Sequence, residues 1–278
     1  DRLRMLRAVR FAARLGFAID DATRAAVAAH ADELAAVSPE RVGDELRRML
    51  AHPARARAAR LVEELGLDAA VFGSRVPASG TRLARLARTA GASTVGRPGD
   101  REEGAWVTPL AAWWLDRVEG EAGCADRPDA RLCESAVAVL RERLVLSNHE
   151  TARLAAILAA RGAILAAMGA PGGFADVAVA RRKRLFAADG FDDALLIVAT
   201  ERPEEAVAVR ALADAELPER RLPTPILDGN ALIAAGHRPG PGFKRWLDLA
   251  LDAQLEGRLS GVEDALALVR AAETPDGA

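Results

Sequence analysis

The first 17 residues, DRLRMLRAVRFAARLGF, restrict the fold more than any other stretch of this 278-residue chain. Their apolar residues recur near the 3.6-residue period of an α-helix. The charged residues between them recur at steps of three and four, at Arg4, Arg7, Arg10 and Arg14. This spacing predicts one amphipathic helix with a ridge of guanidinium groups along one side.

The composition extends this expectation to the rest of the chain. Alanine, arginine and leucine dominate, tyrosine is absent and aromatic residues make up only 4%. These residue types favour helices over sheets. We expect an all-α fold without a sheet, an elongated array of helices in three parts. The parts cover residues 1–72, 73–170 and 171–278, with a linker rich in Gly, Pro and Ser over 73–104.

The charge balance gives no global signature of nucleic-acid binding, because the formal net charge is -2 and the pI is near 6.2. Residues 1–60 differ, with twelve Arg against eight Asp and Glu. Any contact with RNA is therefore expected at a local basic face. Cys124 and Cys133 show no zinc or disulfide spacing, and there is neither a run of about 18 apolar residues nor a signal-peptide pattern. A cytoplasmic protein fits these observations best.

The arginine ridge begins beside an acid. Asp1 precedes Arg4 by three residues, a spacing at which a carboxylate and a guanidinium can lie side by side on a helix. An acceptor next to a planar donor fork could hydrogen-bond the edge of a nucleobase or hold phosphates. A helix with a solvated basic face explains the same spacing.

Several local patterns predict helix boundaries and core positions. Ser38-Pro39 and Ser147-Asn148 are expected to begin helices, and Gly16 to end one. Trp113-Trp114 is expected in the core rather than in contact with RNA bases. Arg181, Arg182, Lys183 and Arg184 are consecutive, so a helix would spread them around its axis. They could form a solubilising collar, or two of them could contact RNA phosphates.

Near the C-terminus, Pro239-Gly240-Pro241-Gly242 predicts a turn at the start of the helix FKRWLDLALDAQLEG. The free backbone N–H groups of a helix start attract anions. Arg238, Lys244 and Arg245 lie beside it in sequence, so an RNA phosphate would be a suitable ligand. A tight turn between two helices is the alternative, and the two interpretations are compatible.

DRLRMLRAVRFAARLGF, together with VSPERVGDELRRML, resembles the neck of class II tRNA nucleotidyltransferases, the CCA-adding enzymes, and of their bacterial poly(A) polymerase relatives. LVLSNHE and the segment from ILDGNALIAAGHRPGPG onward are similar to the body and tail of the same family. The resemblance implies a neck over residues 1–72, a body over 73–170 and a tail over 171–278. In that family a Glu-Asp-x-x-Arg motif selects CTP or ATP by pairing with the base. Asp1 and Arg4 match its last two functional positions, and the motif's Glu would precede Asp1.

The resemblance implies a role for each matching residue. Asp1, Arg4, Arg7 and Arg10 would contact the nucleotide, and Glu40, Arg41 and Glu45 would brace the nucleotide-reading helix. The tail would hold the acceptor and T arms of a tRNA through phosphates at the basic residues Arg238, Lys244 and Arg245. No catalytic residue and no metal ligand is expected in this chain. The family's chemistry, with two Mg²⁺ ions, is carried by a head domain whose motifs this sequence lacks, so we expect a fragment that is inactive alone.

Other identities remain open at this point. Within the family, a poly(A) polymerase or an enzyme that adds only A or only C would show the same features. Outside it, a helical scaffold that binds RNA or protein would leave the arginine ridge solvated.

Overall fold

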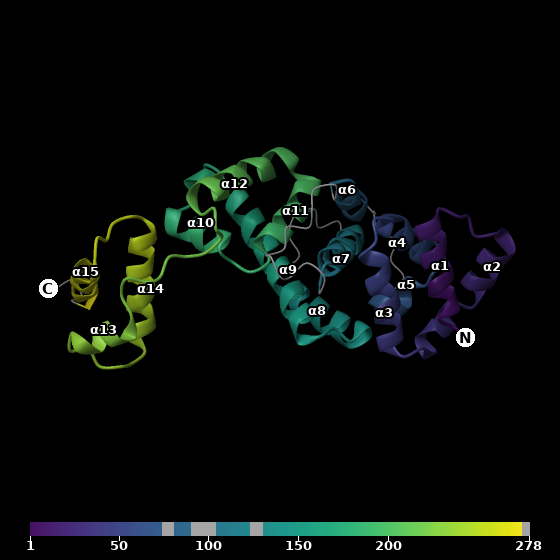
Figure 1. Cartoon of the computed structure of the whole chain (residues 1–278), viewed down its shortest axis with the longest axis horizontal. Coiled ribbons are helices and arrows are strands. Elements are labelled where there is room, and N and C mark those ends of the chain that lie inside the picture. The colour runs from purple at the N-terminus through teal and green to yellow at the C-terminus, as the bar shows by residue number, and fades with distance from the viewer. Residues whose placement is uncertain (74–80, 90–103, 123–129, 274–278) are drawn as a thin grey trace. The chain divides into compact units, whose positions relative to one another are not determined.

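The computed structural model describes residues 1–73, 81–89, 104–122 and 130–273, and in these ranges the chain is helical with no strand (Figure 1). The all-α prediction is confirmed. Most of the predicted linker over 73–104 and residue Cys124 lie outside the described residues. The elements are α1 (Arg4–Leu15), α2 (Asp21–Ala29), η1 (Ala31–Ala36, a 3₁₀ helix), α3 (Pro39–Leu50), α4 (Arg55–Glu64), α5 (Asp68–Phe72), α6 (Thr81–Thr89), α7 (Val107–Ala122), α8 (Ala130–Leu144), α9 (Asn148–Met168), η2 (Phe174–Asp176, 3₁₀), α10 (Val179–Phe186), α11 (Phe191–Glu201), α12 (Pro203–Glu216), α13 (Gly229–Ala234), α14 (Gly242–Leu255) and α15 (Val262–Glu273).

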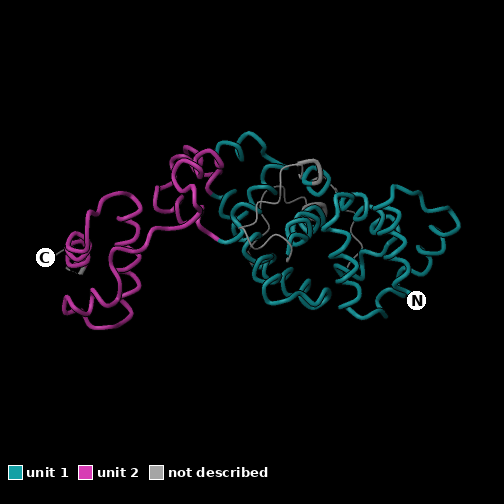
Figure 2. The backbone as a smooth tube through the Cα atoms, in the orientation of Figure 1, with its two compact units in different colours: residues 1–166, 189–208 teal, residues 167–188, 209–278 magenta. Residues whose placement is uncertain are grey.

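The chain divides into two compact units (Figure 2). Unit 1 comprises residues 1–166 and 189–208, and unit 2 comprises residues 167–188 and 209–278. The division cuts α9 and α12, so it follows packing rather than the order of the sequence. The three-part division expected from the sequence stays a prediction.

The first helix begins later than the sequence pattern predicted. Helix α1 begins at Arg4, so Asp1 lies in the turn before it, and it ends at Gly16, whose φ of 77° is left-handed. Glycine adopts this conformation without the steric cost that a side chain brings, which explains why the helix stops there. The next helix, α2, ends at Ala29 and is followed by the 3₁₀ helix η1, which buries Leu34.

In unit 1, helices α1, α3 and α4 pack together, and α3 also packs on α8 (Figure 1). Gly43 of α3 permits the second contact, because an added Cβ would lie 2.4 Å from the carbonyl oxygen of Leu144. Trp113 and Trp114 of α7 are 1% and 7% exposed, which confirms their predicted place in the core. The indole N–H of Trp113 donates to Glu63 at 2.5 Å, so its polar edge is satisfied.

Helix α9 begins with a reciprocal cap. The backbone N–H of Glu150 donates to the Ser147 hydroxyl at 3.1 Å, and the backbone N–H of Ser147 donates to the Glu150 carboxylate at 2.8 Å. This capping box confirms the start predicted at Ser147. The same helix is long and apolar enough to cross a membrane by length and composition alone. Half of its most apolar window is buried inside the protein, as expected for a core helix.

Unit 2 has its own small core between α13, α14 and α15, formed by Leu227, Leu232, Ala250, Ala265 and Val269. Phe243 and Trp246 of α14 pack against this core, with ring centroids 5.7 Å apart. Helix α10 also packs on α14. The start of α14 is therefore held by apolar contacts on one side of the helix.

Candidate functional site

One buried carboxylate organises the exposed side of α1. Glu45 of α3 is 1% exposed. It accepts hydrogen bonds from Nε of Arg10 at 2.7 Å, from Nε of Arg7 at 3.2 Å and from Arg48 at 3.3 Å. Because one acid holds three guanidiniums, the cluster keeps an excess of positive charge, and its arginines are fixed rather than free to swing in water.

Asp1, the acid at the start of the chain, is also held by a residue of α3. Asp1 accepts a hydrogen bond from the backbone N–H of Leu3 at 3.2 Å and pairs with Arg41 of α3 at 3.3 Å. Arg4 is exposed, and among the described residues its guanidinium makes no hydrogen bond or ion pair. Asp1 and Arg4 are close in the chain but are not joined by an ion pair there. Both retain groups that could bind a ligand.

The predicted bracing residues therefore differ in what they do. Glu45 contacts Arg7 and Arg10, and Arg41 contacts Asp1. Glu40 is exposed in the first turn of α3, and among the described residues its side chain has no hydrogen-bond partner. Sequence reasoning missed Arg48. Its position three residues after Glu45, on the same face of α3, was the available signal.

Helix α3 is itself anchored to the start of α9. Arg47 donates from two nitrogens to Glu150, at 2.9 Å each, and Trp106 donates to the same carboxylate at 2.8 Å. Burial raises the pKa of Glu150, but the hydrogen bonds from Arg47, from the Ser147 backbone and from Trp106 outweigh it and lower the pKa to about 2. The carboxylate is thus charged at neutral pH and holds α3, which carries Glu45, in place.

The three predicted RNA-binding residues lie together at the start of α14 in unit 2. Arg238, Lys244 and Arg245 are exposed, and within the described part of the chain their side chains make no hydrogen bond or ion pair. The helix begins at Gly242 without a side-chain cap. The backbone N–H of Phe243 donates to the carbonyl of Gly240 at 3.0 Å, so the three cations are the groups of this helix start that remain available to an anion.

The basic run in α10 is mostly used inside the protein. Arg182 is buried, pairs with Glu216 and donates to the carbonyls of Ala175 and Val177. Lys183 donates to the carbonyl of Leu255 at 2.8 Å, and Arg184 pairs with Asp252 at 2.6 Å, so both hold the last turns of α14. Neither interpretation of the sequence, a solubilising collar or contacts with RNA phosphates, predicted these internal contacts. The run ties α10 to α14 rather than forming a free collar.

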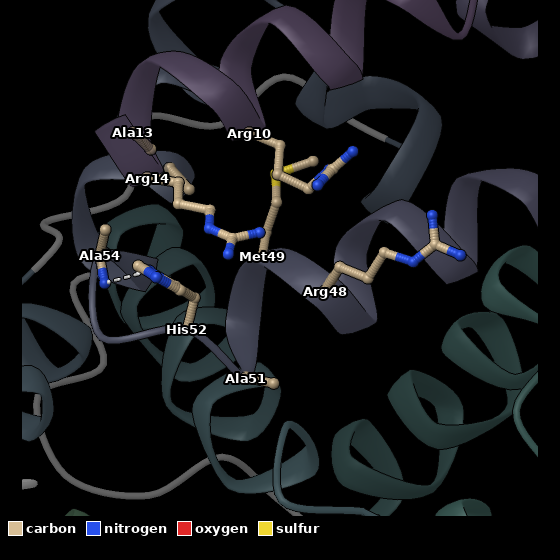
Figure 3. Close-up of a pocket in the computed structure, with 9 residues that line it drawn as sticks. Arg10, Ala13, Arg14, Arg48, Met49, Ala51, His52 and Ala54 are labelled. Atoms are coloured by element: carbon tan, nitrogen blue, oxygen red, sulfur yellow. Dashed lines mark hydrogen bonds between the residues drawn. The ribbon is translucent and has the colours of Figure 1, made fainter. Parts of the chain in front are cut away.

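An open pocket of about 310 Å³ lies where α1, α3 and α4 meet (Figure 3). Three guanidiniums surround small apolar side chains there, and His52 forms part of the wall. Sequence reasoning missed this pocket, because its residues come from three helices and share no motif. The lining residues are Arg10, Ala13, Arg14, Arg48, Met49, Ala51, His52, Ala54 and Ala58.

The described residues do not fit a metal centre. In the ranges given above, no group of three or more His, Cys, Asp or Glu side chains is arranged to hold a metal ion. The Mg²⁺ ions that the family resemblance implies have no ligand set here, so no step of a reaction can be assigned to a metal in this part of the protein.

Comparison with known proteins finds sequence matches over part of the chain. Residues 16–74 match a family model described as the probable RNA and SrmB-binding site of polymerase A. The CCA-adding enzyme of Geobacillus stearothermophilus is 42% identical over 88 residues, which are 32% of this chain and 22% of that enzyme.

Solved structures share the fold over almost the whole chain. The CCA-adding enzyme of Bacillus stearothermophilus in complex with CTP covers 98% of this chain, with a TM-score of 0.63 and 24% identity. A CCA-adding enzyme in complex with ATP covers 99%, with a TM-score of 0.65 and 16% identity. This chain spans 62% and 61% of those two chains.

Taken together, these likenesses show an all-α fold that is shared with CCA-adding enzymes. Over part of its length the chain is similar in sequence to CCA-adding enzymes and to the matched region of polymerase A, and it shares the fold of CCA-adding enzymes over almost its whole length.

Proposed function

We propose that this chain selects the nucleotide and binds the RNA for a tRNA nucleotidyltransferase that adds CCA to tRNA 3′ ends from CTP and ATP. In this proposal Asp1 and Arg4 pair with the edge of the incoming base, and Arg7 and Arg10 bind the same nucleotide. The protein would act in the cytoplasm.

The contacts of Glu45 carry this proposal. A carboxylate that is 1% exposed holds Arg7 and Arg10 at 3.2 Å and 2.7 Å, while Arg4 on the same helix has no partner within the described residues. Recognition of a planar base requires donors held in a fixed plane, because orientation lost on binding would cost affinity. Glu45 supplies that fixation for Arg7 and Arg10 and Arg41 supplies it for Asp1, while Arg4 keeps its N–H groups for the base.

The start of α14 has a different part in the proposal. Its cations Arg238, Lys244 and Arg245 would bind phosphates of the tRNA acceptor and T arms without reading sequence. Transfer of the nucleotide, with its Mg²⁺ ions, would be carried out by the nucleotidyltransferase head that the family resemblance implies. By itself this chain would bind and select but not transfer.

The test is nucleotide choice in the natural full-length protein carrying Arg4→Ala. We expect preference for CTP and ATP over UTP and GTP to fall by about tenfold or more, as for loss of one bidentate base contact, while tRNA affinity changes less than threefold. The measurement is kcat/KM for each nucleotide on a tRNA that lacks its 3′ end. Unchanged nucleotide choice would show that α1 does not read the base.

A poly(A) polymerase is the second candidate, because the matching family model is described by a site of polymerase A. The two activities differ in product. A CCA-adding enzyme stops after three nucleotides on tRNA, whereas a poly(A) polymerase extends an RNA with many adenylates. Gel analysis of the products from tRNA and from an unstructured RNA separates them.

A further inference from the structure

The pocket between α1, α3 and α4 is lined by Arg10, one of the residues predicted to contact the nucleotide, but not by Asp1, Arg4 or Arg7. We propose that it binds one phosphate-bearing nucleotide, with the base on its apolar floor and the phosphate at the guanidinium of Arg14 (Figure 3). This inference rests on the proposed nucleotide- and RNA-binding role of the chain. It adds a second nucleotide position next to that of Asp1 and Arg4.

Small side chains leave the space for a base. Ala13, Met49 and Ala58 are 5%, 2% and 2% exposed and form the floor, while Ala51 and Ala54 lie at the more exposed edge. The volume of about 310 Å³ is at the lower end of the range for small-molecule sites. A thioether and alanine methyl groups provide a polarizable, apolar surface for a flat ring.

The charges around this floor favour an anion. Arg10 and Arg48 each use one nitrogen on Glu45, which leaves their remaining N–H groups for a ligand. Arg14 is exposed and has no hydrogen bond or ion pair within the described residues. The carboxylate of Glu45 is buried behind the arginines, so a ligand in the pocket would meet guanidiniums. Guanidinium forks match the geometry of phosphate oxygens.

His52 adds a neutral donor. Its Nδ1 accepts a hydrogen bond from the backbone N–H of Ala54 at 3.1 Å (Figure 3). A ring nitrogen that accepts carries no proton, so the proton of the imidazole is on Nε2. That N–H is suited to a hydroxyl or a base carbonyl. A ribonucleotide offers both groups beside its phosphate.

The family match favours RNA as the source of this nucleotide. Six of the nine lining residues, Arg48, Met49, Ala51, His52, Ala54 and Ala58, fall within residues 16–74, which match the probable RNA-binding site. A phosphodiester unit of RNA and a free nucleotide present the same phosphate and base. The experiment therefore tests both.

The test measures binding of a fluorescein-labelled single-stranded oligoribonucleotide of C and A residues to the full chain. Arg14→Gln removes a guanidinium, and Ala51→Phe fills the pocket without changing charge. We expect each to weaken binding about fivefold, and Arg14→Gln to reduce the salt slope by about 0.7. The matched control is Arg60→Gln on α4, because Arg60 is exposed, does not line the pocket and has no partner within the described residues. Its effect should stay within twofold.

Competition with CMP and with inorganic phosphate separates the two sources. Displacement of the oligonucleotide by CMP, but not in the Arg14→Gln variant, would identify a free-nucleotide site. Loss of oligonucleotide binding without CMP competition would identify an RNA site. Equal affinities for Arg14→Gln, Ala51→Phe and Arg60→Gln, with helix content unchanged by circular dichroism, would overturn the pocket. If Arg4→Ala still altered nucleotide choice in that case, the proposed function would stand without it.

Discussion

The two basic regions of this chain differ in whether their cations have partners. On α1 in unit 1, Arg7 and Arg10 are held by a carboxylate that is 1% exposed. At the start of α14 in unit 2, Arg238, Lys244 and Arg245 are exposed and have no partner within the described residues. Fixed guanidiniums are suited to a ligand of defined shape, and free cations to phosphates whose positions vary. In the proposed function, this contrast separates recognition of the nucleotide from attachment of the tRNA.

Removal of the anchor should have the largest effect. In Glu45→Ala, three guanidiniums lose their shared acceptor, and we expect the free energy of unfolding to fall by roughly 2–4 kcal/mol. The fall stays below the upper end for buried pairs, because the Arg7 and Arg48 side chains are 46% and 59% exposed and can turn toward water. Urea unfolding followed by tryptophan fluorescence measures the change.

The control for this variant is on the same helix. Glu40→Ala removes an exposed carboxylate without a partner among the described residues, so stability should change by less than about 0.5 kcal/mol. Equal losses of unfolding free energy for Glu40→Ala and Glu45→Ala would mean that the buried, paired carboxylate and the exposed, unpaired one contribute equally to stability. In the full-length protein, Glu45→Ala should also reduce the preference for CTP and ATP over UTP and GTP, whereas Glu40→Ala should not.

The ion pair between Arg47 and Glu150 should make the stability of unit 1 depend on pH, because the carboxylate can titrate. The folded-state pKa of Glu150, about 2, is below its ordinary value of 4.5. Its stabilising contribution is therefore complete above about pH 4.5 and is lost as pH falls toward 2. We expect a loss on the order of 1–2 kcal/mol over this window, after allowance for solvent screening. Urea unfolding at several pH values measures it.

The matched variant is Glu150→Gln, which keeps the shape of the side chain but cannot titrate. Its stability should be lower at neutral pH and should fall less steeply between pH 4.5 and 2. An unchanged slope in this variant would show that other carboxylates cause the acid sensitivity. Arg47 would then be held mainly by its contacts with Val145 and Asp44.

Local signals in the sequence predicted local structure well. The stop at Gly16 and the capping box of Ser147 and Glu150 depend on residues within a few positions of each other. The contact between Arg47 and Glu150 spans 103 residues, and no spacing rule reaches that far. For the same reason the sequence did not predict the pocket at Arg14 and His52, because its lining residues are far apart in the chain.

The basic run of α10 shows the limit in another form. Four consecutive cations are a strong signal for a charged surface, yet Arg182 is 8% exposed and Arg184 pairs with Asp252. Their use depended on acids and carbonyls of α12 and α14, which the run itself does not reveal. A charge count therefore predicts neither which cations a ligand can reach nor which ones hold the fold together.

The smallest effect is expected from the free cations of α14. Replacing both Lys244 and Arg245 with Ala should leave the unfolding free energy within about 0.5 kcal/mol, because neither side chain has a partner among the described residues. Affinity for tRNA should fall several-fold at low salt, and the slope of log affinity against log salt should decrease by about 1.8, since each duplex phosphate contact contributes about 0.9. Nucleotide choice should not change, because phosphate contacts carry no base information. The control is Arg181→Ala, an exposed cation of α10 in the same unit with no partner in the described ranges. A loss of stability in the Lys244 and Arg245 variant, or an equal loss of tRNA affinity in Arg181→Ala, would mean that the start of α14 is not a distinct site of attachment.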